Sequence, residues 1–384
     1  MPYNKIFCSA PFTNLRIENQ RDKSVIFKPC CVYQPSGSIP TLQDFLHGAE
    51  MQSLRANMLS GTVPKFECSN CSIPESMGLT SIRQQLLQQP WASAEEKIIS
   101  LEIFFSNTCN LGCFMCNAEV SSYAAEERYQ TKSLPVRLSA IDNVQLAIDT
   151  MDQLPDLQSI TFIGGEFFLH KRNIEILDIV IKRNLQCAVI TNASILTEPL
   201  LKKLQQIKTL EVGISVDGTD DVYNFMRYPA DWYKLNDNID TLKTSLDNAS
   251  FYVSTVIQPL NIQNLHELYQ WANKKILPLQ HQMLVTPECL TWKILGPDEK
   301  NNLVKFLQLK QQSTYKLTSK QKTVIEQLID GIIQDSFDLD LRRQGVEYLS
   351  RLLVHRKISA DKIQKQLGIF DGLAKEILTE MNLQ

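Results

Sequence analysis

The chain has 384 residues, 43% of them hydrophobic and 21% charged. That composition is typical of a folded globular protein of roughly two to three domains and excludes disordered, collagenous and coiled-coil chains. Lys and Arg number 39 against 42 Asp and Glu, a formal charge of -3, so no bulk positive field favours nucleic acid or an anionic membrane surface. The longest apolar runs fall far short of the ~18 residues that span a bilayer, and Met1–Phe12 contains no apolar signal segment. We therefore expect a cytoplasmic protein with no membrane and no nucleic-acid partner.

The cysteines are distributed unevenly along the chain. Eight of the ten lie in the first 116 residues, and only Cys187 and Cys289 stand apart. A disulfide framework is typical of short secreted chains, and this chain is long and has no visible signal peptide. The cysteine pattern therefore favours metal ligation in the first third of the sequence.

Residues 1–95 are rich in turn formers and show no sustained periodicity. One helix is expected over Leu42–Leu59, ended by Gly61. Such a segment has little core of its own, so a bound metal would supply part of its folding free energy.

From about residue 98 onward, short apolar runs of strand length alternate with segments of helical spacing. The expected strands are Ile98–Phe105, Ser159–Ile163, Cys187–Thr191, Thr209–Val216, Phe251–Ile257 and Gln282–Thr286. This alternation predicts an α/β fold of parallel βα units, forming a partial (β/α)6 barrel over residues 96–295.

After Gly296–Pro297 the strand signal disappears, and residues 296–384 are predicted to be helical. The helices could form a cap packed on the barrel, a lid, a dimer surface or a substrate-docking module. A packed cap is the simplest of these interpretations.

The strongest motif is a C-x3-C-x2-C pattern directly after the first barrel strand, formed by Cys109, Cys113 and Cys116. Three thiolates can hold three irons of a [4Fe–4S] cluster and leave the fourth iron open. A zinc loop or a chance occurrence is the alternative for this motif taken alone. The motif and its position resemble the radical S-adenosylmethionine (SAM) superfamily. The resemblance implies that SAM binds the open iron and is cleaved reductively to methionine and a 5′-deoxyadenosyl radical.

The ends of later strands strengthen this resemblance. Gly164, Gly165 and Glu166 after the second strand are similar to the family's GGE motif, which implies that this region binds the SAM amino group. Phe167 stands where the family usually has proline. Asn192 after the third strand is similar to the family's T-N-G turn.

The fourth strand and the segment after it continue the pattern. Ser215 and Asp217 match the family's I-S-x-D-G sequence, and the resemblance places Ser215 and Arg227 near the SAM ribose and carboxylate. A guanidinium binds a carboxylate well through two hydrogen bonds, although a surface ion pair is the alternative for Arg227. Met115 stands where the family usually has an aromatic residue that helps to hold the adenine.

The cysteines before the barrel resemble the auxiliary-cluster module of SPASM/twitch radical SAM enzymes, placed here at the N-terminus. The resemblance assigns Cys8, Cys30, Cys68 and Cys71 to one auxiliary [4Fe–4S] cluster and leaves Cys31 as an extra thiol. A structural zinc site is the alternative, because four thiolates also suit zinc.

The two isolated cysteines are interpreted differently. Cys187 opens a strand and is expected to be a core residue. Cys289 follows the sixth strand, and we give it a catalytic role as a hydrogen donor to a substrate radical, with plain packing as the alternative.

These observations predict a radical SAM oxidoreductase or maturase. The resemblance implies modification of a ribosomally made peptide or protein, with radical oxidation of a sugar-like or other small molecule as the alternative. It also implies an electron donor such as flavodoxin or ferredoxin. A hypothesis of another class is a catalytically inactive binding protein stabilised by an iron–sulfur cluster or zinc.

Overall fold

The computed structural model describes residues 7–383 except 21, 23, 77–80, 135–137, 139 and 313–316. The chain forms two compact units. The first comprises Met1–Ser106, Ile141–Val189 and Pro199–Glu211. The second comprises Asn107–Ala140, Ile190–Glu198 and Val212–Gln384.

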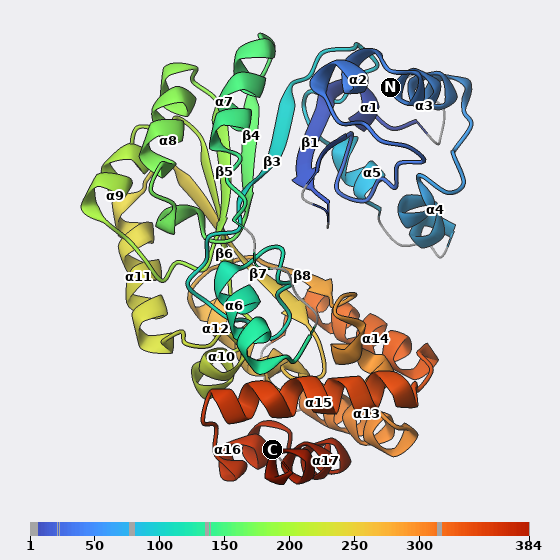
Figure 1. Ribbon diagram of the computed structural model, residues 1–384, viewed down its shortest axis with the longest axis vertical. Coiled ribbons are helices and arrows are strands. Elements are labelled where there is room, and N and C mark those ends of the chain that lie inside the picture. Colours follow the sequence, from blue (N-terminus) through green and yellow to red (C-terminus); the bar gives the residue numbers. More distant parts are fainter. Residues whose placement is uncertain are drawn as a thin grey trace. The chain divides into compact units, whose positions relative to one another are not determined.

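Strands and helices alternate along most of the chain (Figure 1). The strands are β1 (Asn14–Asn19), β2 (Val25–Lys28), β3 (Ser100–Ser106), β4 (Ser159–Gly164), β5 (Gln186–Thr191), β6 (Leu210–Ser215), β7 (Ala249–Ile257) and β8 (Leu279–Met283). The first unit contains β2, β1, β3 and β4 in that order, followed by most of β5, and the second unit contains most of β6, followed by β7 and β8. The pairs β1–β3, β3–β4, β4–β5 and β7–β8 are parallel, and β1–β2 is antiparallel. The predicted α/β fold with a parallel sheet is therefore confirmed.

Helices precede, connect and follow these strands. Up to the end of β8 they are α1 (Ala10–Thr13), α2 (Leu42–His47), α3 (Ala49–Ser60), α4 (Ser69–Ser76), α5 (Ile82–Leu86), α6 (Ser122–Thr131), α7 (Val144–Gln153), α8 (Asn173–Lys182), α9 (Glu198–Leu204), α10 (Asp220–Met226), α11 (Trp232–Ser245) and α12 (Leu265–Lys274). The C-terminal helices are α13 (Pro297–Gln312), α14 (Ser319–Gln334), α15 (Leu339–His355), α16 (Ala360–Gln366) and α17 (Asp371–Asn382). Short 3-10 turns are η1 (Phe167–Leu169), η2 (Ile262–Asn264), η3 (Glu288–Leu290) and η4 (Trp292–Ile294).

The core of the first unit follows the registers of its parallel strands. Leu101 on β3 lies beside Ile160 on β4, which in turn lies beside Cys187 on β5. All three side chains are buried. The prediction that Cys187 is a core residue is therefore confirmed.

The N-terminal segment contains strands that the sequence reading did not predict. In β1, Leu15 and Ile17 are buried, while Arg16 pairs with Glu18 at 2.7 Å on the other face. This is the apolar–polar alternation of a half-buried strand, extended over too few residues to give sustained periodicity. Through β1, the segment joins the sheet next to β3.

The single helix expected over Leu42–Leu59 is wrong, because the structure has two helices there. The backbone at Gly48 is extended (ψ 154°), so α2 ends at His47 and α3 begins at Ala49. The predicted end is confirmed, because Gly61 adopts the left-handed conformation that terminates α3.

The last predicted strand is displaced by three residues, since β8 covers Leu279–Met283 rather than Gln282–Thr286. Its side chains alternate between half-buried and exposed, so it carries a weak apolar signal. The helical prediction for the C-terminal region is confirmed by α13–α17.

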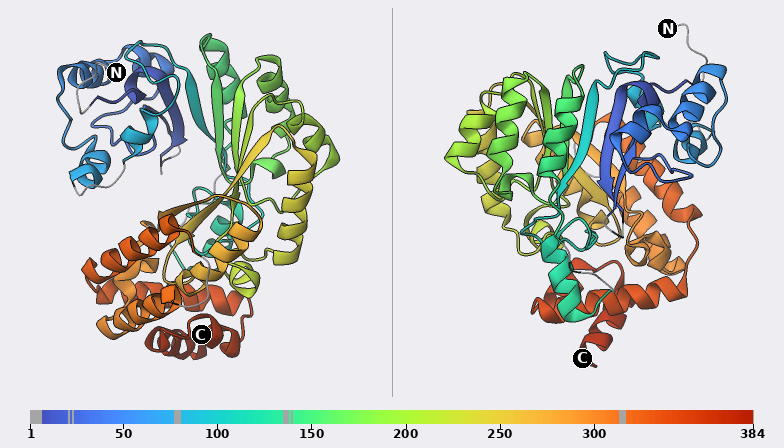
Figure 2. Two further views of the ribbon diagram at one scale, coloured as in Figure 1. Left: turned by 180° about the vertical axis from the view of Figure 1, so that it is seen from behind. Right: turned by 45° about the horizontal axis from the view of Figure 1, so that its top comes forward.

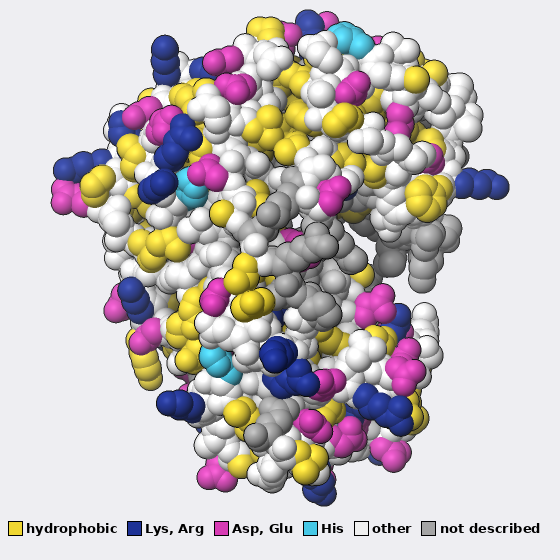
Figure 3. Space-filling view, in the orientation of Figure 1, with side chains coloured by type: hydrophobic (Ala, Val, Ile, Leu, Met, Phe, Trp, Pro, Cys, Tyr) yellow, Lys and Arg dark blue, Asp and Glu magenta, His cyan; other side chains and the backbone are white. Residues whose placement is uncertain are grey.

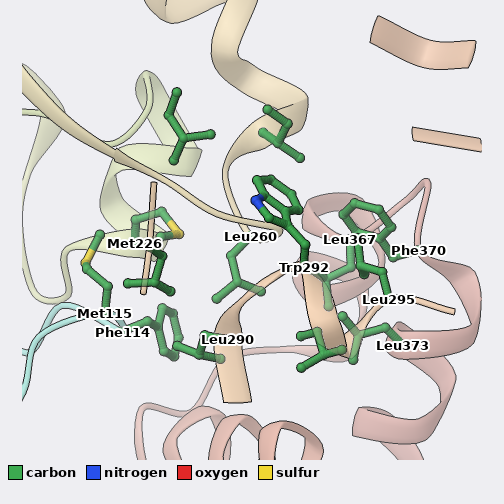
Figure 4. Packing of buried hydrophobic residues seen from close by; sticks show 14 of the residues in the cluster. Phe114, Met115, Met226, Leu260, Leu290, Trp292, Leu295, Leu367, Phe370 and Leu373 are labelled. Carbon is green, nitrogen blue, oxygen red and sulfur yellow. The ribbon is translucent and has the colours of Figure 1, made fainter. Parts of the chain in front are cut away.

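The core of the second unit includes residues of β7 and of the C-terminal helices. The course of these helices is drawn from two further sides in Figure 2. Figure 4 shows Leu367, Phe370 and Leu373 packed beside Trp292 and Leu295. The same apolar cluster includes residues of the three-cysteine loop. The C-terminal helices and this loop therefore share one core.

Charged side chains of both signs are interspersed over the face shown in Figure 3. Among the residues that the structure describes, no helix is both long and apolar enough to span a bilayer.

Candidate active site

The three predicted cluster ligands lie on the loop between β3 and α6, in the second unit. Cys113 is buried, and Cys109 and Cys116 are partly buried against the same apolar cluster. The Cys116 thiol donates a hydrogen bond to the Cys113 sulfur, which lowers the pKa of Cys113 to about 7 and raises that of Cys116. The loop therefore carries the three cysteines in a mostly buried place and brings the sulfur atoms of Cys113 and Cys116 into contact.

Backbone hydrogen bonds fix this loop against the segment after α10. The Gly112 N–H donates to the Tyr228 carbonyl at 2.7 Å, and the Phe114 N–H donates to the Met226 carbonyl at 3.2 Å. Arg227 lies between these two acceptors, and its Nη1 donates to the Cys113 sulfur at 3.8 Å. The predicted cofactor residue Arg227 and the cluster loop are thus held together by the backbone.

Arg227 and Asp217 form a buried ion pair, with Nη2 and Oδ2 2.6 Å apart. Asp217 also accepts hydrogen bonds from the Val256 N–H at 2.7 Å and the Thr255 hydroxyl at 3.3 Å. Despite burial, the charge of Asp217 raises the pKa of Arg227 above its ordinary value. The alternative of a surface ion pair for Arg227 is wrong, because the pair has almost no solvent exposure.

The predicted T-N-G-like turn lies against the same loop. The Asn192 side chain donates to the Asn110 Oδ1 at 3.1 Å, and the Asn110 amide donates to the Ser194 hydroxyl at 2.9 Å. The sequence reading did not select Asn110 or Ser194. Asn110 could have been found from its place inside the cysteine motif, whereas Ser194 carries no separate signal.

The two remaining cofactor residues predicted in the second unit are placed as follows. Ser215 ends β6 and is half-buried. Met115 is buried and lies beside Phe114 in the apolar cluster, near Met226 (Figure 4). The structure therefore brings Met115, Asn192, Asp217 and Arg227 to the cysteine loop or its immediate partners.

The GGE-like motif belongs to the first unit, at the end of β4. Gly164 has a φ of +124°, and a Cβ there would collide with the Ser106 carbonyl oxygen. The Gly165 N–H donates to that same oxygen at 2.7 Å. Glycine is thus required at position 164 because the backbone of β3 comes close to it, whereas the family motif led us to expect a close approach by the ligand.

Glu166 is buried, 1% exposed, and accepts a hydrogen bond from the Phe168 N–H at 3.0 Å. Phe167, at the position where proline was expected, stacks on Phe162 with ring centroids 4.7 Å apart. The departure from the family pattern therefore has a packing reason.

The four predicted auxiliary ligands Cys8, Cys30, Cys68 and Cys71 line one cavity in the first unit. Burial raises the pKa of Cys8 to about 12 and that of Cys68 to about 11. Cys31 is not part of the cavity wall. Across the described part of the chain, no three His, Cys, Asp or Glu side chains converge on a point suited to one metal ion.

Cys289, predicted to donate hydrogen to a substrate radical, lies in η3 and is 4% exposed. Burial raises its pKa to about 11. Its carbonyl oxygen faces Gly345 of α15, and its neighbours belong to the apolar cluster. These surroundings match the packing alternative, and the catalytic role stays a prediction.

Residues 103–272 match the family model of the Radical SAM superfamily. An uncharacterized protein of Methanocaldococcus jannaschii is 28% identical over 177 residues, 43% of this chain and 55% of that protein. The chain therefore spans about half the length of this curated relative.

Similar solved structures include anSMEcpe with bound AdoMet, with a TM-score of 0.43 and 19% identity, covering 62% of this chain and 64% of that one. Streptococcus suis SuiB bound to precursor peptide SuiA has a TM-score of 0.38 and 12% identity, covering 72% of this chain and 53% of that one. The family match begins in β3, just before the three-cysteine loop, and ends in α12. Residues 103–272 are therefore similar to the radical SAM superfamily domain.

Proposed function

We propose that this protein cleaves SAM reductively and uses the resulting radical to abstract hydrogen from a substrate. The observation that carries the proposal is the place of Cys109, Cys113 and Cys116 on one loop of the region that matches the radical SAM family, with Arg227 donating to the Cys113 sulfur. The match to the radical SAM family supports an enzyme, and the three thiols of the loop supply the ligand set that this chemistry requires.

The residues present fit a [4Fe–4S] cluster with one open iron. Three soft sulfur donors lie on one loop, and Cys113 and Cys116 are already within hydrogen-bond distance. Cys109, Cys113 and Cys116 would hold the cluster. When bound and reduced, the cluster supplies the electron that cleaves SAM into methionine and a 5′-deoxyadenosyl radical.

The chain's own side chains would bind and orient SAM. Arg227 offers a guanidinium that Asp217 fixes in place, and a guanidinium is the side-chain group that binds carboxylates best. Ser215 and Asn192 supply hydrogen-bonding groups, and Met115 supplies an apolar surface for the adenine. Glu166, together with Gly164 and Gly165, is assigned to the SAM amino group from its place in the GGE-like motif.

For the N-terminal segment we propose an auxiliary [4Fe–4S] cluster of the SPASM/twitch type, held by Cys8, Cys30, Cys68 and Cys71. Their common cavity supports this assignment. A structural zinc ion remains the competing occupant.

For the substrate we propose a ribosomally made peptide or protein, because auxiliary clusters of this type accompany such modifications in the resembling enzymes. Oxidation of a sugar-like small molecule is the second candidate. Reduction would require a one-electron donor such as flavodoxin or ferredoxin, and the expected location is the cytoplasm.

Anaerobic reconstitution with iron and sulfide, followed by dithionite and SAM, tests the proposal. We expect about eight irons per chain and formation of 5′-deoxyadenosine. A reduced cluster that produces no 5′-deoxyadenosine would favour an inactive scaffold instead. Zinc in place of four of the irons would overturn only the auxiliary cluster.

A further inference from the structure

Side chains of α6 and α15 surround the backbone of the three-cysteine loop. The Tyr348 hydroxyl donates to the Phe114 carbonyl at 2.8 Å, and Arg128 Nη2 donates to the same oxygen at 3.1 Å and to the Cys113 carbonyl at 3.3 Å. Arg356, directly after α15, donates to the Gly112 carbonyl and lies over the Phe114 ring, 4.3 Å from its centroid. Three consecutive carbonyls of the loop are therefore held by side chains.

Three guanidinium groups thus lie at this loop, and two of them are neutralised. Arg227 pairs with Asp217 at 2.6 Å, and Arg356 pairs with Glu127 at 2.6 Å. Arg128 pairs with no carboxylate among the residues described, and it is only 1% exposed. Its Nε donates to the Tyr348 hydroxyl at 3.0 Å, and its Nη1 has no hydrogen-bond partner.

The carbonyls that Arg128 contacts do not require it. The Cys113 carbonyl also accepts the Cys116 N–H at 3.1 Å, and the Phe114 carbonyl accepts the Tyr348 hydroxyl. An unpaired buried charge is costly, and neutral hydrogen bonds recover only part of that cost. The positive charge of Arg128 therefore indicates a negative group that binds beside this loop.

We propose that Arg128, positioned by Tyr348, compensates the negative charge of the cluster bound at the loop and raises its reduction potential. The inference rests on the proposed function, since it requires a cluster at Cys109, Cys113 and Cys116. A [4Fe–4S] core with three thiolates is anionic when oxidised and gains one more negative charge on accepting an electron. A nearby fixed cation stabilises the more negative reduced state more strongly.

This assignment gives the C-terminal region a function besides packing. Tyr348 is fully buried in α15, 220 residues along the chain from Arg128. Its hydroxyl accepts from Arg128 while donating to the loop, so it fixes the guanidinium relative to the cysteines. Tyr348 is a positioning residue, and its effect should be smaller than that of Arg128.

The test is an anaerobic redox titration of the reconstituted full-length protein with dithionite, followed by electron paramagnetic resonance. The cluster at the loop is identified as the one whose spectrum changes when SAM is added. The variants are Arg128→Met, Arg128→Lys and Tyr348→Phe. The matched control is Arg342→Met. Arg342, in α15, is a buried arginine like Arg128, but it pairs with Glu299 and Glu376 and has no contact with the loop carbonyls.

We expect the midpoint potential to fall in Arg128→Met, to fall less in Tyr348→Phe and to be largely restored in Arg128→Lys. Arg342→Met should lower the unfolding free energy and leave the potential unchanged. In the iron-free protein, Arg128→Met should be as stable as the wild type or more stable, because an uncompensated charge is removed.

An unchanged potential in Arg128→Met overturns the inference. If that variant does not fold, Arg128→Gln and Tyr348→Phe take its place, and no shift in either has the same meaning. A wild-type protein without any SAM-sensitive cluster would instead contradict the proposed function, so the two failures are distinguishable.

Discussion

The two groups of cysteines lie in different electrostatic surroundings. On the loop after β3, the pKa of Cys113 is lowered to about 7 by the Cys116 hydrogen bond, with the Arg227 and Arg356 guanidiniums acting in the same direction. In the N-terminal cavity, burial raises the pKa of Cys8 to about 12 and that of Cys68 to about 11. On the loop, Cys113 is thus favoured as an anion while its donor Cys116 stays a neutral thiol, whereas burial favours the neutral thiol at both Cys8 and Cys68.

The fixed charges around the two groups of cysteines also differ. Arg128, Arg227 and Arg356 lie at the loop, with Asp217 and Glu127 as the opposing carboxylates. The N-terminal cavity contains one guanidinium, Arg83, which pairs with Glu75, and a further carboxylate, Glu67, in its wall. Fixed positive charges at the loop would therefore stabilise a negative group there. The N-terminal cysteines have no such excess of positive charge, so metal binding itself would have to displace their thiol protons.

Removing each cysteine group in turn is the most drastic test of this comparison. Changing Cys109, Cys113 and Cys116 together to Ala should eliminate all 5′-deoxyadenosine and about four irons per chain. Changing the four N-terminal cysteines to Ala should also remove about four irons, but SAM cleavage should persist. Iron analysis and chromatography measure both results. SAM cleavage by the loop triple variant would contradict the assignment of the loop.

The charged support of the loop can be tested by breaking its buried ion pair. Glu127→Gln leaves Arg356 buried without a carboxylate, with side-chain exposures in the wild type of only 2% and 1%. Loss of one partner of such a pair costs about 3–5 kcal/mol, which denaturant unfolding can measure. Asp221→Asn is the control, because its pair with Lys365 is exposed and should leave the unfolding free energy unchanged. Equal effects from the two variants would show that the buried pair gives no special support.

The close approach of α15 to the segment containing Cys289 predicts a smaller loss of stability than breaking the buried ion pair. A Cβ at Gly345 would collide with the Cys289 carbonyl oxygen. Gly345→Ala should therefore destabilise the protein by about 1–3 kcal/mol, although alanine is the better helix former. Gly331→Ala in α14 is the matched control, since nothing lies within 4 Å of a Cβ there, and it should stabilise by about 0.5–1 kcal/mol. A stabilising Gly345→Ala would mean that α15 is free to move away.

Local patterns were sufficient to predict the elements that pair in sequence order. The apolar runs of β3 to β7 contain buried residues that mostly alternate with half-buried ones, and the cysteine spacing placed the loop ligands after β3. The same reasoning missed β1, whose buried side chains are only Leu15 and Ile17. It also missed Tyr348 and Arg128, because a contact across 220 residues leaves no local signal and the polar sequence of α6 is typical of an exposed helix.

The smallest predicted effect concerns Cys289, for which packing and hydrogen donation make different predictions. Cys289→Ala removes a buried sulfur from the apolar cluster and should lower the unfolding free energy by about 1 kcal/mol. Cys187→Ala removes the same atom from the buried strand β5 and should cost a similar amount. SAM cleavage should be intact in both variants. Once a substrate is identified, turnover in D2O separates the two roles, since a donor thiol exchanges with solvent and would place deuterium on the product carbon. Full turnover of Cys289→Ala, or an unlabelled product, would leave Cys289 with the packing role that its surroundings already favour.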